Sequence, residues 1–449
     1  GRIVGTGAEE VKLDAGATGG TGASITLGST TGIGSGDQIA KITLDGEDGV
    51  DLSGALKSVG TGSLVSITGP VALSQNISID TSTDNGTVTF ETSGTTINGA
   101  KTLTISSGSG DVTFQGAIGT AGTGIGNIDV NATAGTGDIE IFEMGTSGGV
   151  MGATGTVDIG NSTTTSITLD GTTYKTDGNT EFDATATGAS IKLTGVSPVM
   201  TMAAGHTLKF TTADVELSGT SGTGDVGTTT FTAPGGATFA GDIIGKSGMS
   251  GTESLTIETG GGALDIGGSI GGSGKAIGTL LINSSGNGTI AIAGIGTSSA
   301  VGVSGTTTIG NSSTGSITLD GAEYNTTGAQ TYEATGGTNI DITGTATEIA
   351  TAGANITFST ADLELNNDGT TTITSGGSSN AGNISFAGAI EANGTSDVLT
   401  IVSGAGSVSF SDVIGKTHEL AGLNVKTSNL CSEITLPTGI DKEGKERTA

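Results

Sequence analysis

Four acidic side chains lie within a single seven-residue segment of this chain. Asp45, Glu47, Asp48 and Asp51 are separated only by glycine and valine. Carboxylate oxygens are ligands that Ca²⁺ prefers, although this spacing is not that of an EF-hand. The two later Leu-Asp-Gly sequences lack the extra acids, and an acidic turn in solvent would have the same composition. The segment therefore leaves two interpretations, a calcium site formed by these four acids or a solvated turn.

Residue types that usually carry catalysis are rare. Arginine occurs only at Arg2 and Arg447, and histidine only at His206 and His418. Enzymes that cleave polysaccharides need clustered acids, or a base beside a metal, and no such constellation stands out. A His-Glu-x-x-His helix and a P-loop are missing from the sequence, and no Gly-x-Ser-x-Gly segment joins a predicted strand to a predicted helix, as a serine-nucleophile elbow must. Cys431 has no second cysteine with which to form a disulfide. We expect no catalytic residues, no enzyme activity and no cofactor, with calcium as the one ion that the acids could bind.

Composition and charge exclude several classes of protein. Glycine accounts for 85 of 449 residues, and 15 basic residues against 44 acidic ones give a net charge of −29. This charge repels phosphate, so neither nucleic acid nor anionic lipid is an expected partner. No apolar run approaches the roughly 18 residues of a membrane helix, so no membrane span is expected. Glycine without a three-residue period is not collagen, and a low content of charge and proline is not typical of disorder.

Short segments of alternating apolar and polar residues recur along the whole chain. Examples are Ile42-Thr-Leu44, Val112-Thr-Phe114 and Ile356-Thr-Phe358, and glycine, serine, asparagine or aspartate separate such segments. A period of two is the pattern of a strand with one buried face, and the intervening residues favour turns. The fold class predicted is all-β.

Internal repetition indicates which all-β fold to expect. The sequence Ile-Gly-Asn-Ser at 159–162 returns at 309–312, and Ser-Ile-Thr-Leu-Asp-Gly at 166–171 returns at 316–321, both 150 residues later. Leu-Thr-Ile occurs three times with the same residues spaced behind it, starting at Leu103, Leu255 and Leu399. Such phrases predict three imperfect long repeats, at roughly 1–135, 136–285 and 286–426.

The first repeat is about 25 residues shorter than the others. Its Leu44-Asp-Gly lies 125 residues before Leu169-Asp-Gly, in place of 150. A solenoid can lose a coil of ~20–25 residues without disturbing its neighbours, because each coil contacts only the adjacent ones. We therefore predict a continuous right-handed parallel β-helix, a β-solenoid of about twenty coils over residues 1–426.

A family resemblance becomes visible in the last repeat. The phrases there resemble the β-strand repeats of secreted bacterial adhesins of the filamentous-haemagglutinin type, which include autotransporter-like surface proteins. The matching segments are Thr326–Tyr332, Ile356–Phe358, Phe386–Ile390, Leu399–Ile401, Phe410–Gly415 and Leu420–Val425. The resemblance covers most of the chain and implies a right-handed β-helix, secretion and a role as a surface or matrix fibre. It implies no catalytic residues.

Three functions remain open at this point. The first is an extracellular structural protein at the cell surface, the repeat segment of a self-assembling and adhesive filament, sheath or biofilm matrix fibre. The second is a module that binds glycans or another surface, and the third is an array of Ig-like sandwiches. The expected partners are other copies of the chain and surface glycans. The start at Gly1 suggests a mature or excised piece, and residues 427–449 form a tail that could be a cap or a docking segment.

Overall fold

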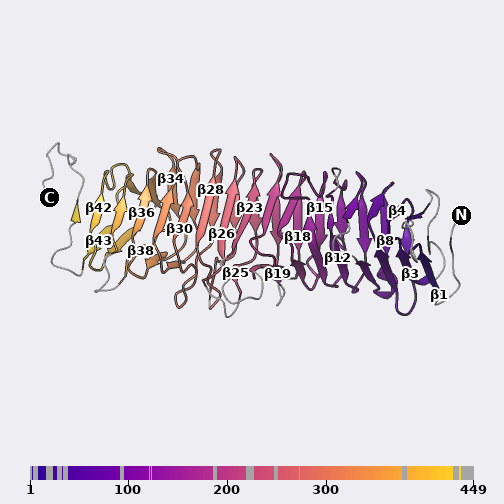
Figure 1. Ribbon diagram of the computed structural model, residues 1–449. Coiled ribbons are helices and arrows are strands. Elements are labelled where there is room, and N and C mark those ends of the chain that lie inside the picture. The colour runs from indigo at the N-terminus through magenta and orange to yellow at the C-terminus, as the bar shows by residue number, and fades with distance from the viewer. Residues whose placement is uncertain are drawn as a thin grey trace. The chain divides into compact units, whose positions relative to one another are not determined.

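The computed structural model describes residues 3, 9–16, 24–27, 33, 39–91, 96–120, 122, 124–185, 190–218, 227–246, 251–272, 274–376, 382–427 and 434–435. The chain divides into two compact units, Gly1–Ser221 and Gly222–Ala449. Each unit is a parallel β-solenoid whose strands form three parallel ladders, called faces below (Figure 1). A few turns reach one of the faces only through an isolated β-bridge, as at Ile270 and Ile295. The prediction of an all-β solenoid is confirmed, and the parallel pairing rules out an array of Ig-like sandwiches, whose strands pair antiparallel.

The first unit has three faces, each named after one of its strands. Its β3 face contains β1 (Glu9–Asp14), β3 (Ile39–Asp45), β6 (Leu64–Thr68), β9 (Thr87–Phe90), β12 (Val112–Ile118), β14 (Ile139–Met144), β16 (Ile167–Leu169), β19 (Ser190–Leu193) and β22 (Asp214–Leu217). Its β4 face contains β2 (Ser24–Thr26), β4 (Gly49–Leu52), β7 (Val71–Leu73), β10 (Thr96–Asn98), β17 (Thr173–Thr176) and β20 (Val199–Met202), joined by the ends of β12 and β14. Its β8 face contains β5 (Leu56–Lys57), β8 (Ile77–Asp80), β11 (Leu103–Ser106), β13 (Ile128–Val130), β15 (Val157–Gly160), β18 (Thr180–Asp183) and β21 (Leu208–Thr211).

The second unit has three corresponding faces. Its β36 face contains β23 (Thr228–Ala233), β26 (Ser254–Thr259), β28 (Leu280–Ser284), β30 (Thr307–Gly310), β33 (Gln330–Glu333), β36 (Ile356–Ser359), β39 (Ile384–Phe386), β42 (Val408–Phe410) and β44 (Ile434–Thr435). Its β34 face contains β24 (Ala237–Phe239), β27 (Leu264–Ile266), β29 (Thr289–Ile292), β31 (Ser316–Leu319), β34 (Asn339–Ile342), β37 (Asp362–Leu365) and β40 (Ile390–Ala392). Its β35 face contains β25 (Ile243–Gly245), β32 (Glu323–Thr326), β35 (Glu348–Thr351), β38 (Thr370–Thr374), β41 (Val398–Val402) and β43 (Gly422–Lys426).

Helix is almost absent from the described part of the chain, where the one helical element is η1 (Ser82–Asp84). None of the helical structure described there is long and apolar enough to cross a membrane.

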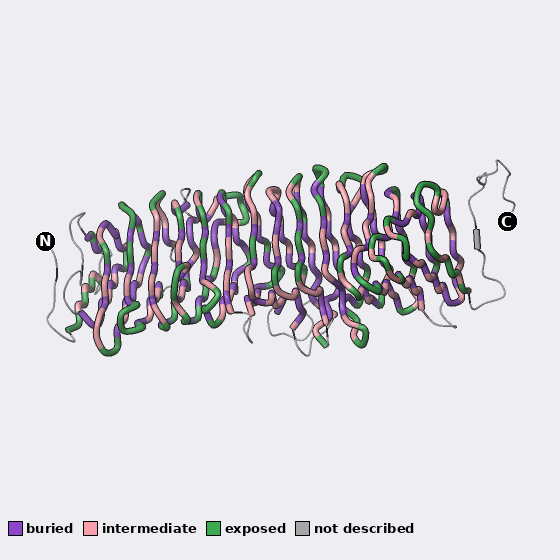
Figure 2. Tube along the Cα trace, turned by 180° about the vertical axis from the view of Figure 1, so that it is seen from behind, coloured by how far each residue is buried: buried purple, intermediate pink, exposed green. Residues whose placement is uncertain are grey.

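Inward side chains of successive turns lie directly over one another. On the β3 face, one interior column of paired residues runs Leu44, Ile67, Phe90, Phe114, Ile141, Leu169. All six are buried, while the residues next to them in each strand are half-buried or exposed, apart from the buried Ser66. Figure 2 shows how burial varies along the chain, with buried stretches along the strands and exposed corners between them. Burial of these apolar columns is the main stabilising contribution in each unit.

Aromatic rings stack inside the solenoid as well. In the second unit the rings of Tyr332, Phe358, Phe386 and Phe410 follow one another with centroid separations of 5.1, 5.1 and 5.2 Å. Each ring comes from the strand one turn after the previous one, so the spacing reflects the ~4.8 Å strand separation of a β-sheet.

The turns are longer, and therefore fewer, than the sequence suggested. The β8 face of the first unit and the β34 face of the second have one strand per turn, and together they give about 14 turns in the described residues, not twenty. A short turn separates the paired residues Leu319 and Ile342 by 23 positions, and a long one separates Val130 and Ile159 by 29. Corners of variable length account for the difference.

The long sequence repeat is out of phase with the turn. In the second unit, Leu255 belongs to the β36 face, and five turns later its column reaches Ile384. Its sequence equivalent, Leu399, lies two strands further on, in β41 of the β35 face. In the first unit, by contrast, Leu44 and its equivalent Leu169 lie in one column exactly five pairings apart. The shortened repeat therefore lacks two strands of a turn, where the sequence suggested one whole coil.

The stacked rings provide a direct test of this core. We expect Phe358→Ala to lower the free energy of unfolding by about 3–5 kcal/mol, because it removes the second ring of a four-ring stack and leaves a cavity. Leu423→Ala, at a position that is 39% exposed, should cost less than about 1 kcal/mol. Urea denaturation of both variants measures the two values, and equal losses would contradict the role assigned to the stack.

Candidate functional site

The four acids of the predicted calcium segment lie around one corner of the first unit. Asp45 is the last residue of β3, and Asp51 lies within β4 on the neighbouring face, while Glu47 and Asp48 are exposed between them. The Gly49 N–H donates to the Gly46 carbonyl at 3.1 Å, which closes the turn. Asp51 Oδ1 accepts a hydrogen bond from Ser74 Oγ at 2.6 Å. Asp51 is thus engaged by the next turn along its face.

Within the residues that the structure describes, no group of three or more histidine, cysteine, aspartate or glutamate side chains is arranged to hold a metal ion. A Ca²⁺ site needs six to eight oxygens that converge on one point. Calcium binding at Asp45, Glu47, Asp48 and Asp51 stays a prediction of the sequence.

The later Leu-Asp-Gly sequences have a structural role that the sequence did not reveal. After each of them, a buried tyrosine closes the corner: Gly171 N–H donates to Tyr174 Oη at 2.8 Å, and Gly321 N–H donates to Tyr324 Oη at 2.9 Å. Tyr324 Oη in turn donates to the Ile292 carbonyl at 2.6 Å, and burial raises the pKa of its hydroxyl. The corresponding position of the first repeat is Gly49, so the acidic segment occupies a corner that has no such tyrosine.

The glycine of this motif is required by close packing of backbones. A Cβ at Gly321 would lie 1.5 Å from the carbonyl oxygen of Ala293, and one at Gly171 would lie 1.7 Å from that of Phe142. At both positions, substitution by any other residue would force two adjacent turns apart.

Strand stacking assembles a column of acidic side chains on the β8 face of the first unit. Asp129, Asp158 and Glu181 occupy paired positions on three successive turns, and Lys209 occupies the next. Glu181 is partly neutralised, because Lys209 Nζ lies 4.0 Å from its Oε2 and Thr211 Oγ1 donates to its Oε1 at 2.9 Å. The column therefore concentrates negative charge around its middle member, Asp158.

Burial and like charge both act on this column. Burial raises the pKa of Asp158, and the carboxylates of Glu181, Asp129 and Asp183 raise it further. Asp183, on the same turn as Glu181, also has a pKa above its usual value because burial outweighs its hydrogen bond with Thr212, and its Oδ1 has no hydrogen-bond partner among the described residues. These acids hold protons more tightly in the folded chain than in the unfolded one.

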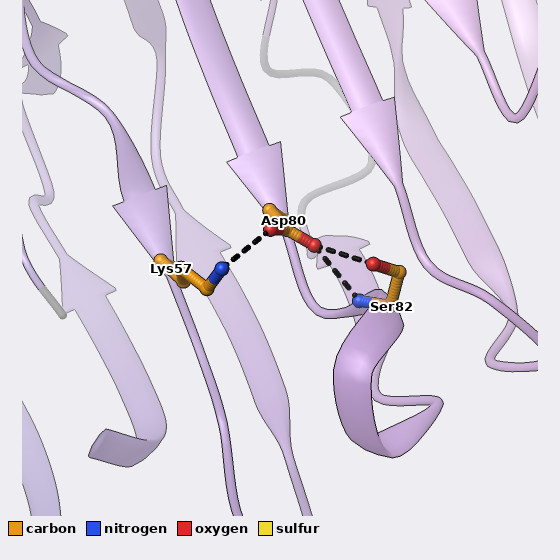
Figure 3. Close-up of polar contacts among 3 residues, drawn as sticks. All are labelled: Lys57, Asp80 and Ser82. Carbon is orange, nitrogen blue, oxygen red and sulfur yellow. Dashed lines mark hydrogen bonds and ion pairs between the residues drawn. The ribbon is translucent and has the colours of Figure 1, made fainter. Parts of the chain in front are cut away.

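A nearby acid on the same face shows the opposite behaviour (Figure 3). Lys57 Nζ lies 3.1 Å from Asp80 Oδ2, and Ser82 donates to Asp80 Oδ1 from its hydroxyl at 2.7 Å and from its backbone N–H at 3.1 Å. Burial alone would raise the pKa of Asp80, but the Ser82 hydrogen bonds and the Lys57 ammonium outweigh it and lower that pKa. The difference between Asp80 and Asp158 lies in their partners.

The second unit repeats the acidic arrangement on its β34 face. Asp341, Glu364 and Glu391 are paired on successive turns, and burial followed by the charge of Glu364 raises the pKa of Asp341. The Glu391 carboxylate accepts backbone N–H bonds from the segment 416–418, including one of 2.8 Å from His418. Carboxylates thus serve here both as a charged column and as acceptors that fix a loop.

In the described part of the chain, neither histidine ring bonds to the acids of these columns, although the His418 backbone N–H donates to Glu391. His206 Nδ1 lies 3.4 Å from Asn179 Oδ1 in the first unit, and His418 is exposed in the second. Cys431 and most of the predicted tail 427–449 lie outside the described residues, as do both arginines. A linear column of acids can bind protons or attract diffuse cations, but it does not direct ligands to one point.

These columns could not be found from sequence spacing. Asp129 and Asp158 are 29 residues apart, whereas Asp158 and Glu181 are 23 apart, so no fixed period connects them. Strand alternation does identify each as an outward-facing residue, and the missing information is which strands stack.

Comparisons with known proteins do not extend this description: no protein-family model, curated protein or solved structure matches the chain.

The raised pKa of Asp158 gives a pH-dependent prediction. A folded-state pKa above the unfolded value means that the contribution of this group to stability falls as pH rises through the folded pKa. Asp158→Asn should therefore raise the free energy of unfolding near pH 7, by on the order of 0.5 kcal/mol after solvent screening. Near pH 3, where the carboxyl group is protonated in both states, the gain should disappear.

Asp80→Asn provides the matched control on the same face. The pKa of Asp80 is lowered, so its contribution is present above the unfolded pKa and is lost as pH falls through the folded one. This variant should be less stable than the parent near pH 7. Urea denaturation at both pH values measures the two variants, and a stability loss in Asp158→Asn near pH 7 would contradict the electrostatic interpretation.

Proposed function

We propose that this chain is a repeat segment of an extracellular structural protein, a surface filament, sheath or matrix fibre that self-assembles and adheres to surfaces. The proposal includes a right-handed solenoid, because about 98% of parallel strand connections are right-handed. It also assigns the protein no enzymatic role. The secreted location rests on the resemblance of the repeats to those of filamentous-haemagglutinin-type adhesins.

The observation that carries the proposal is the strand pairing at the outermost described strands. In the second unit, β43 pairs through the described residues with β41 only. Strands β1 and β43 have mostly exposed or half-buried side chains. A strand paired on one side presents free N–H and C=O groups, to which another strand can add. A solenoid of stacked turns can therefore be continued by a further copy.

The register of β43 identifies a backbone N–H on its outer edge whose removal would test the proposal. The Lys426 carbonyl accepts a hydrogen bond from Ser403 N–H at 3.1 Å, so Lys426 faces β41. Because backbone groups alternate in direction along a parallel strand, the N–H of Val425 faces away from β41. Proline at this position would remove a donor from the outer edge and leave the bonds to β41 in place.

We expect the purified chain to form end-to-end filaments at rising concentration, visible by negative-stain electron microscopy. Val425→Pro should shorten them several-fold, while Val425→Ala, which keeps the N–H, should leave their length unchanged. Circular dichroism would check that both variants keep their β-sheet content. A wild-type chain that sediments as a monomer at every concentration would contradict the proposal, and so would filaments unaffected by the proline.

A further inference from the structure

One face of the second unit carries hydroxyl groups in a nearly uncharged array. Six outward positions on successive turns of the β36 face are paired in register, and all are half-buried. They are Leu281, Thr308, Thr331, Thr357, Ser385 and Ser409. Ser385 Oγ donates to Thr357 Oγ1 at 3.3 Å, so neighbouring hydroxyls lie close enough to bond along the column.

The flanking positions are also mostly neutral. Just before the strands, Asn355 Oδ1 accepts the N–H of Asn383, and Asn383 Oδ1 accepts the N–H of Ser407, both at 2.9 Å. On β28, β30, β33, β36, β39 and β42, Glu333 is the one charged residue. We call the outward positions of these six strands the neutral face.

The β34 face of the same unit differs sharply. Its equivalent paired column reads Asp265, Ala291, Thr318, Asp341, Glu364, Glu391, so four of six positions are carboxylates. In a chain of net charge −29, the neutral face thus carries a single acid, Glu333, on six strands. The β34 face carries four carboxylates in one column, and the β35 face carries Glu323, Glu348 and Lys426 on its strands.

We propose that the neutral face is a lateral contact between two copies of this chain, packed face to face. Two chains of −29 repel each other within roughly a Debye length, about 10 Å at 0.1 M salt, so two identical faces can pack closely where neither carries much charge. Hydroxyl and amide groups both donate and accept hydrogen bonds, so such a face is complementary to itself, as an interface about a two-fold axis requires. A nucleic acid or another polyanion would need cationic side chains on the protein surface, and the six strands of the neutral face carry none.

The size of the face indicates how strong the contact is. Six strands at ~4.8 Å and four residues at ~3.3 Å cover about 400 Å² per copy, or about 800 Å² in total. That is below the roughly 1,200 Å² of a stable interface, so one pair of chains would associate weakly. Along a filament the same contact repeats with every subunit and becomes effective through multivalency. In this respect the inference rests on the proposed function.

Charge substitutions test the contact directly. The double variant Thr331→Glu with Thr357→Glu places two carboxylates in the centre of the neutral face, and Thr331→Lys with Thr357→Lys places two ammonium groups there. The matched control is Thr372→Glu with Thr400→Glu, two outward threonines paired in register on β38 and β41 of the β35 face. Thermal unfolding checks that all three are folded, and electron microscopy measures the fraction of filaments that lie in pairs.

We expect wild-type filaments to pair side by side, and each face variant alone to lose pairing at least about tenfold. An equimolar mixture of the Glu and Lys variants should restore pairing, because opposite charges then meet across the contact, and the control should pair as the wild type does. If wild-type filaments stay single, this inference is wrong and the proposed function is unaffected. If no filaments form at all, both this inference and the proposed function are wrong.

Two further outcomes would overturn the contact between copies. Equal loss in the control would mean that added charge acts through general repulsion and not at this face. The other outcome combines two results: insoluble cellulose retains the wild type but not the Glu variant, and the mixture of Glu and Lys variants does not restore pairing. These results together would assign the face to a neutral polysaccharide.

Discussion

In-register stacking of parallel strands is the constraint on which every other feature of each unit depends. Each strand must place its inward side chain over the one a turn earlier, as in the column from Leu44 to Leu169. The same register brings the rings of Phe358 and Phe386 into contact and lets Asn355 accept a hydrogen bond from the following turn. Corners, by comparison, vary in length, because they need only return the chain to the same register.

Stacking acts on outward side chains as well, and there it is not always favourable. A strand spacing of ~4.8 Å that suits two isoleucines forces two carboxylates close together. Asp158 carries that electrostatic cost among its acidic neighbours, whereas Asp80 avoids it through Lys57 and Ser82. Each face thus acquires its own electrostatic character from a few outward residues, independently of the uniform apolar interior.

The sequence is informative about whatever repeats locally and uninformative about whatever depends on stacking. Alternation in segments such as Ile356-Thr-Phe358 is sufficient to predict strands, and the repeats and scarcity of helix patterns are sufficient to predict a solenoid. The number of turns was overestimated because corner lengths cannot be derived from alternation. The pairing of Asp129 with Asp158 and the tyrosine closure at Gly321 were missed because both depend on which segments become neighbours. The acids at 45–51, close in sequence, fall on two faces and their intervening corner.

The mismatch between the long repeat and the turn has an evolutionary consequence. Leu255 and its equivalent Leu399 occupy different faces. A duplicated segment therefore keeps the inward apolar side chains of the original, while its outward side chains lie on a different face beside different residues. Two strands with their corners, less than a complete turn, are then a length by which such a chain can differ between repeats and keep its core. Selection can therefore change the outward residues of each face while the repeated segments keep their inward apolar residues.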